Sequence, residues 1–175
     1  MEEIKSQLCP FCKAKALTLI EEEREIPYFG KGYLMSMTCS NCKYHISDIE
    51  LTDNKGPISY TFTVKNKKDL NVRVVKSSQA TIKIPQLKMS VTPGPASVGY
   101  ISNIEGVLQR FKAIIESQRD AAEEDSEKRT AKNLLKKLWK VGLGEEELRI
   151  IIEDPTGNSA IISKDAEVKK LKAKA

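Results

Sequence analysis

The four cysteines of the chain form two pairs with the same spacing, Cys9 with Cys12 and Cys39 with Cys42. In a C-x-x-C pair a tight turn directs two sulfur atoms towards one ion, and two such turns supply the tetrahedron that zinc prefers. Disulfide bonds are the alternative, but they are typical of exported proteins. The N-terminal sequence MEEIKSQLCP has no basic segment leading into an apolar stretch, so no secretory signal is visible. The spacing therefore predicts one zinc ion bound by these four cysteines.

Four cysteine ligands leave no coordination position for water or substrate, whereas a catalytic zinc keeps one open. We therefore expect a structural zinc. His45, the only histidine, lies three residues after Cys42 and is expected at the surface or beside the metal rather than among its ligands. The sequence also lacks the H-x-E segment of zinc deaminases, a second histidine for a two-histidine iron site, and a G-x-x-x-x-G-K-[ST] phosphate loop. We expect a protein that is not an enzyme.

Length and charge restrict the class of protein further. The chain has 175 residues, of which 40% are hydrophobic, and no apolar run approaches the roughly 18 residues that a membrane-spanning helix needs. Its 29 Lys and Arg against 24 Asp and Glu give a formal net charge of +5. That excess neither requires nor excludes a polyanionic partner. We expect a soluble, cytoplasmic protein.

Patterns typical of β-strands position the cysteines and then continue along the chain. Residues 17–22 and 33–38 are rich in β-forming side chains and flank Pro27, Gly30 and Gly32, which predicts a zinc-ribbon hairpin with an aromatic loop at Tyr28 and Phe29. Beyond a turn at residues 52–57, apolar and polar residues alternate in several short segments. Such spacing predicts a sandwich or small barrel. The alternating segments cover residues 58–64, 70–74, 80–84 and 87–91, and strand-forming residues return at 148–152 and 160–162.

The period changes to that of a helix at Ser102. Ser102 and Glu105 have capping-box spacing, and an apolar stripe with helical period follows. A second stripe is expected to end at Gly142 and Gly144. The apolar residues of the two stripes are Ile104, Val107, Leu108, Phe111, Ile114 and Ile115, then Leu134, Leu135, Leu138 and Trp139. We expect a zinc module at residues 1–50, a β domain at 51–163 with a helical hairpin inserted at about 102–143, and a frayed basic tail at 164–175.

The chain resembles the ZPR-type zinc-finger proteins in their single-module archaeal form. The resemblance runs from Cys9 to Ser159 and rests on the order of several short motifs. The chain departs from the family at Lys43, where Gly commonly follows the second cysteine pair, and at Asp48, where Glu is usual. The motifs are both C-x-x-C pairs, I-P-Y-F at 26–29, D-L at 69–70, V-V-K-S at 74–77, I-P-Q-L at 84–87, I-E-G-V-L at 104–108 and D-P-T-G-N-S at 154–159.

This resemblance implies a fold and a function. The fold would be mainly β, with a four-cysteine zinc ribbon followed by a double-stranded β-helix domain that carries a helical insertion. Eukaryotic members bind translation elongation factor one-alpha and assist its folding. The resemblance thus implies a noncatalytic, zinc-dependent adaptor or folding factor acting on the archaeal counterpart of that GTPase.

Two pairs of residues are candidates for partner contact. Tyr28 and Phe29 would be presented by the ribbon, although they could equally pack between the ribbon and the β domain. Asp154 and Asn158 lie in the D-P-T-G-N-S turn, where such side chains more often close their own turn through hydrogen bonds.

An alternative function is a zinc ribbon that binds nucleic acid in transcription. Five bases near the cysteines would support it, but acidic residues at 21–23 and 25 lie among them and weaken the positive field. A solvated surface of mixed charge is the simpler interpretation. The bases are Lys13, Lys15, Arg24, Lys31 and Lys43.

Overall fold

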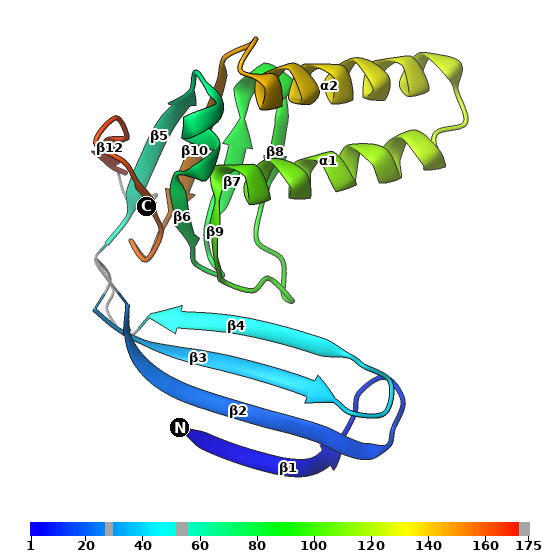
Figure 1. Ribbon diagram of the computed structural model, residues 1–175, viewed down its shortest axis with the longest axis vertical. Helices are drawn as coiled ribbons and strands as arrows, with labels where there is room; N and C mark the ends of the chain where they lie inside the picture. Colours follow the sequence, from blue (N-terminus) through cyan, green and yellow to red (C-terminus); the bar gives the residue numbers. More distant parts are fainter. Residues whose placement is uncertain (27–29, 52–55, 172–175) are drawn as a thin grey trace.

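The computed structural model describes residues 1–26, 30–51 and 56–171. Two β regions and a projecting helical hairpin make up this part of the chain (Figure 1). The predicted aromatic loop at Tyr28 and Phe29 lies outside the described residues. Neither described helix combines the length and the apolar character needed to cross a bilayer.

The first β region, which we call the zinc module, is an antiparallel sheet in the order β1-β2-β3-β4. The predicted hairpin at 17–22 and 33–38 is confirmed, and it extends until Ile26 pairs with Gly30. Strands β1 and β4 flank it and were not predicted. Every residue of β1 is exposed, so its sequence has no buried face to produce an apolar alternation. The strands are β1 (Glu2–Leu8), β2 (Lys15–Ile26), β3 (Gly30–Cys39) and β4 (His45–Leu51).

The second region, which we call the β domain, contains a five-stranded and a three-stranded sheet, in the orders β12-β5-β10-β7-β8 and β11-β6-β9. The predicted fold class, mainly β with a helical insertion, is confirmed. Among the described residues both sheets stay open, so they form a sandwich and no closed barrel. The elements are β5 (Ile58–Val64), η1 (Lys67–Asn71), β6 (Arg73–Lys76), β7 (Thr81–Ile84), η2 (Pro85–Leu87), β8 (Met89–Val91), β9 (Tyr100–Asn103), β10 (Leu148–Asp154), β11 (Ala160–Ile162) and β12 (Glu167–Lys170).

Strand β10 lies at the centre of the larger sheet, between β5 and β7. The chain therefore leaves the β domain for the helices and returns to complete it, as the change of period predicted. Apolar residues of both sheets and of both helices form one buried cluster. Its fully buried members include Val64, Val74, Ile82, Ile104, Val107, Leu148, Ile150 and Ile152.

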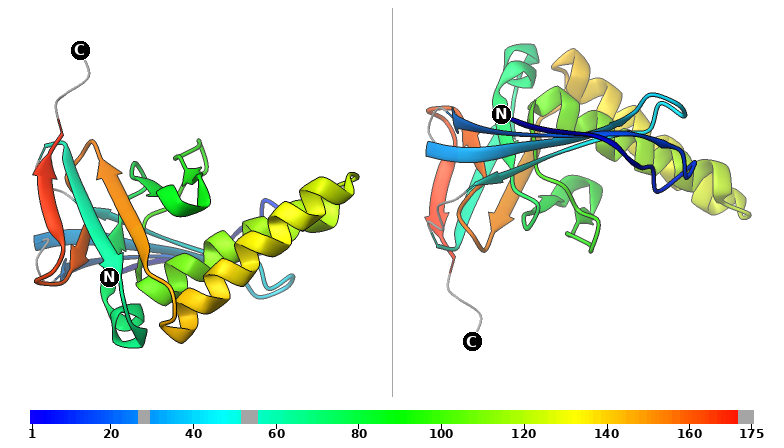
Figure 2. Two further views of the ribbon diagram at one scale, coloured as in Figure 1. Left: turned by 90° about the horizontal axis from the view of Figure 1, so that it is seen from above. Right: turned by 90° about the horizontal axis from the view of Figure 1, so that it is seen from below.

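Helices α1 (Ile104–Ala121) and α2 (Asp125–Leu143) form a hairpin that points away from the β domain (Figures 1 and 2). The first apolar stripe is confirmed, except that Ile114 is only half-buried. The predicted cap is wrong by one residue. Asn103 caps α1, because its Oδ1 accepts a hydrogen bond from the Gly106 amide at 2.8 Å. Ser102 pairs with Val74 in the β6–β9 ladder, which keeps it in a strand.

Two further predictions, one for α2 and one for the C-terminal segment, are wrong. The sequence predicts Trp139 in the second apolar stripe, but its side chain is 64% exposed because Leu138 and Val141 already occupy the buried face of α2. The prediction of a frayed tail is wrong for residues 167–170, which form β12 and pair with the outer edge of β5. Backbone pairing holds this lysine-containing segment although all four side chains are exposed.

The two β regions are in contact through a small junction. Ile26 and Ile49 of the zinc module share a buried cluster with Val75 of β6 and Ala160 of β11. Beside it, the Asp48 carboxylate accepts a hydrogen bond from the Gly99 amide at 2.6 Å. Asp48 makes this contact, and it is the shorter acid at a position where the resemblance implies Glu.

Candidate metal centre

Each C-x-x-C pair lies in a turn closed by two backbone hydrogen bonds. In the first turn the Lys13 amide donates to the Cys9 carbonyl at 3.0 Å, and the Cys9 amide donates to the Ala14 carbonyl at 2.9 Å. The second turn, between Cys39 and Tyr44, repeats the two bonds at 3.0 and 2.8 Å. The turns join β1 to β2 and β3 to β4, so the pairing of β2 with β3 brings them together.

The four sulfur atoms all lie within 4.8 Å of one another. Sγ of Cys9 is 3.7 Å from Sγ of Cys42, and Sγ of Cys12 is 3.7 Å from Sγ of Cys39. A tetrahedral ion with Zn–S bonds of about 2.3 Å requires sulfur atoms about 3.8 Å apart, whereas a disulfide bond is about 2.05 Å long. All four cysteines are free. The arrangement therefore fits one structural zinc ion and no disulfide.

The surroundings of the thiols close the site on the side of the sheet. Cys9 and Cys39 are fully buried and pack against Leu17, while Cys42 is exposed. The Asn41 side-chain amide donates to Sγ of Cys12 at 3.6 Å, and this hydrogen bond is the main reason that the pKa of Cys12 is lowered to about 6. A thiol with a low pKa is ready to bind metal as a thiolate.

His45 lies outside this group, as the sequence predicted. It is exposed, and its Nδ1 is 2.9 Å from the Thr38 hydroxyl, across the β3–β4 ladder. The four thiols form the complete candidate ligand set in the part of the chain that the structure describes.

An exposed aromatic side chain lies directly beside the metal centre. Phe11, between Cys9 and Cys12, is 72% exposed. Its ring lies 4.6 Å from that of Tyr44, which follows the second turn, with an angle of 34° between the planes. This pair was not predicted from the sequence. Its signal was the large aromatic residue inside the first C-x-x-C, where the turn directs side chains outwards.

Asp154 and Asn158 lie in the interior of the β domain. Asp154 is fully buried and Asn158 is 8% exposed. One oxygen of the Asp154 carboxylate accepts hydrogen bonds from the amide and hydroxyl of Thr156, and the other accepts from the hydroxyls of Ser77 and Ser159. The carboxylate thus closes its own turn and joins it to the end of β6. Contact between Asp154 and a partner stays a prediction, and it would require this network to open.

The environment of Asp154 has an electrostatic consequence. Burial by itself would raise the pKa of the carboxyl, but the hydrogen bonds from Ser159, Thr156 and Ser77 outweigh it, and the pKa of Asp154 is lowered. Nearby, Lys76 is also buried and donates to the Ser77 carbonyl at 2.9 Å. Loss of hydration lowers the pKa of Lys76.

Fold and site together define a zinc-finger protein in which a four-cysteine module is joined to a β-sandwich domain. Residues 3–54 match the model of the ZPR1 zinc-finger domain, and residues 68–175 match that of the ZPR1 jelly-roll domain. The chain belongs to the ZPR1 family, which confirms the resemblance found in the sequence.

Two archaeal relatives match nearly the whole chain. An uncharacterized ZPR1-like protein of Methanocaldococcus jannaschii is 37% identical over 95% of this chain and 85% of its own length. Another from Pyrococcus horikoshii is 37% identical over 98% of this chain and 78% of its own. The zinc finger chaperone zpr1 of Schizosaccharomyces pombe is 30% identical over 78% of this chain but only 30% of its own length.

Proposed function

We propose that this chain is a noncatalytic, zinc-dependent adaptor or folding factor that binds a translational GTPase, the archaeal counterpart of elongation factor one-alpha. Membership of the family supports a protein-binding role, because the relative from S. pombe is named a chaperone. The observation that carries the proposal is the aromatic pair at the metal centre.

Phe11 and Tyr44 belong to different C-x-x-C turns, and their rings meet only when both turns are held in place. Zinc bound by the four thiols would supply that restraint. Large exposed aromatic side chains are frequent anchors in protein interfaces. The metal would thus act on binding indirectly, by presenting Phe11 on a rigid surface.

A noncatalytic role agrees with the chemistry of the two polar centres. Four thiolates would fill the coordination sphere of zinc and leave no position for a substrate. The charged groups of the β domain that have unusual surroundings, Asp154 and Lys76, are buried and bonded to their neighbours. We place the proposed function in the cytoplasm, where a translational GTPase works.

Nucleic-acid binding by the ribbon has weaker support. Arg24 is paired with Glu22 and Lys31 with Glu23, both at 2.9 Å. These pairs offset two of the five bases that suggested a basic ribbon. A polyanion would meet a surface of mixed charge along β2 and β3.

The experiment is a binding titration of the zinc-loaded chain against a purified GTPase of the elongation factor one-alpha type, in its GDP and GTP-analogue states. We expect Phe11→Ser to weaken binding about tenfold or more, as expected for loss of an interface anchor, with an unchanged zinc content. Ile101→Ser is the matched control, because Ile101 is 43% exposed but lies in β9. Absence of binding in both nucleotide states would overturn the proposal.

A further inference from the structure

The outer face of α2 is strongly basic. Between residues 128 and 141 the helix carries six Lys and Arg and no acid. Lys132, Lys136 and Trp139 follow each other at helical spacing on one face, and all three are exposed. The face thus combines a row of positive charges with the only tryptophan of the chain.

Trp139 borders an apolar groove between the two helices. The groove has a volume of about 300 Å³ and is lined largely by leucine side chains of both helices and of η1. Glu105 and Lys112 of α1 provide charged groups at its rim. The lining leucines are Leu70, Leu108, Leu135, Leu138 and Leu143.

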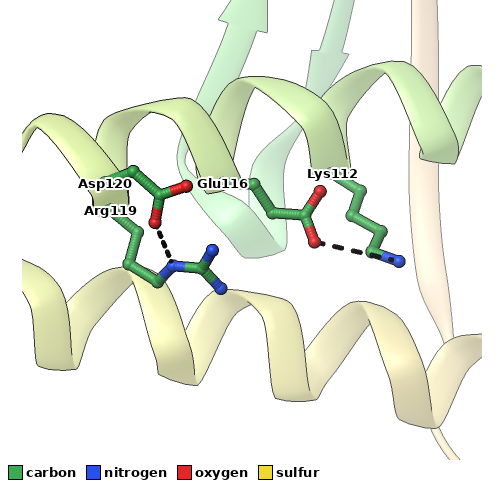
Figure 3. Close-up of polar contacts among 4 residues, drawn as sticks. All are labelled: Lys112, Glu116, Arg119 and Asp120. Atoms are coloured by element: carbon green, nitrogen blue, oxygen red, sulfur yellow. Dashed lines mark hydrogen bonds and ion pairs between the residues drawn. The ribbon is translucent and has the colours of Figure 1, made fainter.

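Few of the described residues neutralise the charges of this face. Lys137 is 3.6 Å from Glu146, but the other five bases between residues 128 and 141 have no carboxylate within 4.0 Å among the described residues. Two acids of α1 pair within their own helix, Glu116 with Lys112 at 3.9 Å and Asp120 with Arg119 at 2.8 Å (Figure 3), and the third, Glu105, lies at the rim of the groove. The positive row on α2 is therefore available to a ligand.

We infer that this face binds an acidic, amphipathic segment of a partner protein. An apolar side chain of the segment would enter the groove against Trp139, and its carboxylates would lie over Lys132 and Lys136. Helices that dock into apolar grooves bind in this way, with anchors at helical spacing, and complementary charges guide the encounter. The inference rests on the proposed protein-binding function and assigns a second surface, separate from Phe11.

The groove favours a protein segment over a nucleic acid. Leucine side chains dominate its lining, and they offer an apolar anchor a matching cavity. Single-stranded nucleic acids instead need stacking aromatics in series along a basic groove, and Trp139 is one isolated ring on this face.

Trp139 makes the site directly observable. Because it is the only tryptophan, its fluorescence reports on this face alone. The probe is a 16-residue peptide with leucines at helical spacing and glutamates elsewhere. We expect saturable binding with a shift of the emission to shorter wavelength as the 64% exposed ring becomes covered.

Variants of the chain locate the site. The fluorescence anisotropy of the labelled peptide measures how tightly each variant binds it. The double variant K132E/K136E should weaken binding about tenfold or more, and Trp139→Ala by a similar factor. The control K65E/K164E changes the net charge equally at exposed residues beside β5 and β12, and it should leave binding unchanged.

Several outcomes would overturn the inference: no saturable change, equal binding of a peptide with the same composition but scrambled leucines, tighter binding of single-stranded RNA or DNA at Trp139, or self-association of the chain through this face. Failure of the peptide while the GTPase still binds would remove this inference alone. Binding of the peptide without binding of the GTPase would remove the proposed GTPase partner and leave this surface.

Discussion

The zinc module and the β domain reach a folded state by different means. In the β domain, side chains from both sheets and the helices form one large buried cluster. In the described part of the zinc module, the buried residues at the candidate metal centre are Cys9, Leu17 and Cys39, and β1 is exposed along its whole length. A sheet with so little apolar core needs a covalent or metal link, which four thiolates and one zinc ion supply. The comparison shows that two sheets of one chain can depend on different interactions.

Loss of the metal should give the largest difference between the two regions. We expect Cys39→Ser to abolish stoichiometric zinc binding and amide protection in β2 and β3, while β5 and β10 stay protected, because structural zinc contributes about 10–16 kcal/mol in small zinc modules. Elemental analysis and hydrogen exchange measured strand by strand would check this. Thr38→Ser in the same strand serves as the control. Simultaneous loss of protection in both regions would show that the junction makes them one cooperative unit.

Asp154→Asn should destabilise the β domain and spare the metal centre. We expect a loss of about 2–3 kcal/mol at pH 7, because a buried charge-assisted hydrogen-bond network is broken. The pKa of Asp154 is lower in the folded state than its unfolded value of about 3.9, so its contribution is present above that pH and is lost as the pH falls through the folded pKa.

Urea unfolding of the wild type and Asp154→Asn at pH 7 and pH 3 measures this contribution, and the difference between them should narrow at pH 3. Thr156→Val retains the amide donor to Asp154 and should cost less. An equal difference at both pH values would contradict the assignment to this carboxylate.

Gly99→Ala tests the junction between the regions. A Cβ atom at Gly99 would lie 2.6 Å from the Ile49 carbonyl and 2.8 Å from its side chain, so the contact between β4 and the β domain must shift. We expect a loss of about 1–3 kcal/mol, as for overpacking at buried positions. Gly94→Ala is the control, because a Cβ there meets no atom within 4 Å. Thermal unfolding, monitored by hydrogen exchange in each region, would show whether the two regions then open separately. Equal stability of the two variants would exclude a stabilising junction.

Lys43→Gly should give the smallest change in stability, and that change should be a gain. Lys43 has a φ of 63°, in the left-handed region, and its counterpart Lys13 has a φ of 59°. Glycine adopts this conformation without the steric cost of a Cβ, so we expect the zinc module to gain about 0.5–1 kcal/mol. Competition with a chelator would report the gain as tighter zinc binding. Lys15→Gly, in the extended strand β2, should weaken it instead.

The sequence predicted the parts that depend on local spacing. Two C-x-x-C pairs imply one four-sulfur site wherever the turns meet, and the sulfur separations of 3.7 Å agree. The period of two located β5 and β10, and the helical period located α1. The resemblance also implied a glycine at the position of Lys43, and the φ of 63° is a conformation that glycine adopts without steric cost.

Other features could not be predicted because they depend on residues far apart in the chain. The capping box at Ser102 was displaced by strand pairing with β6, and β12 forms because β5 has a free edge. Trp139 belongs to an apolar helical pattern, but only the position of α2 against α1 decides which side of the stripe is covered.

The sequence by itself determined the metal chemistry and the alternation of strands and helices, since both follow from the types and spacing of neighbouring residues. Only the tertiary structure decided which polar and aromatic side chains face solvent. It buries Asp154 with Ser77, which lies 77 residues earlier, and it leaves Phe11 and Trp139 exposed. Burial depends on what the rest of the fold places against a residue, and no local pattern contains that information.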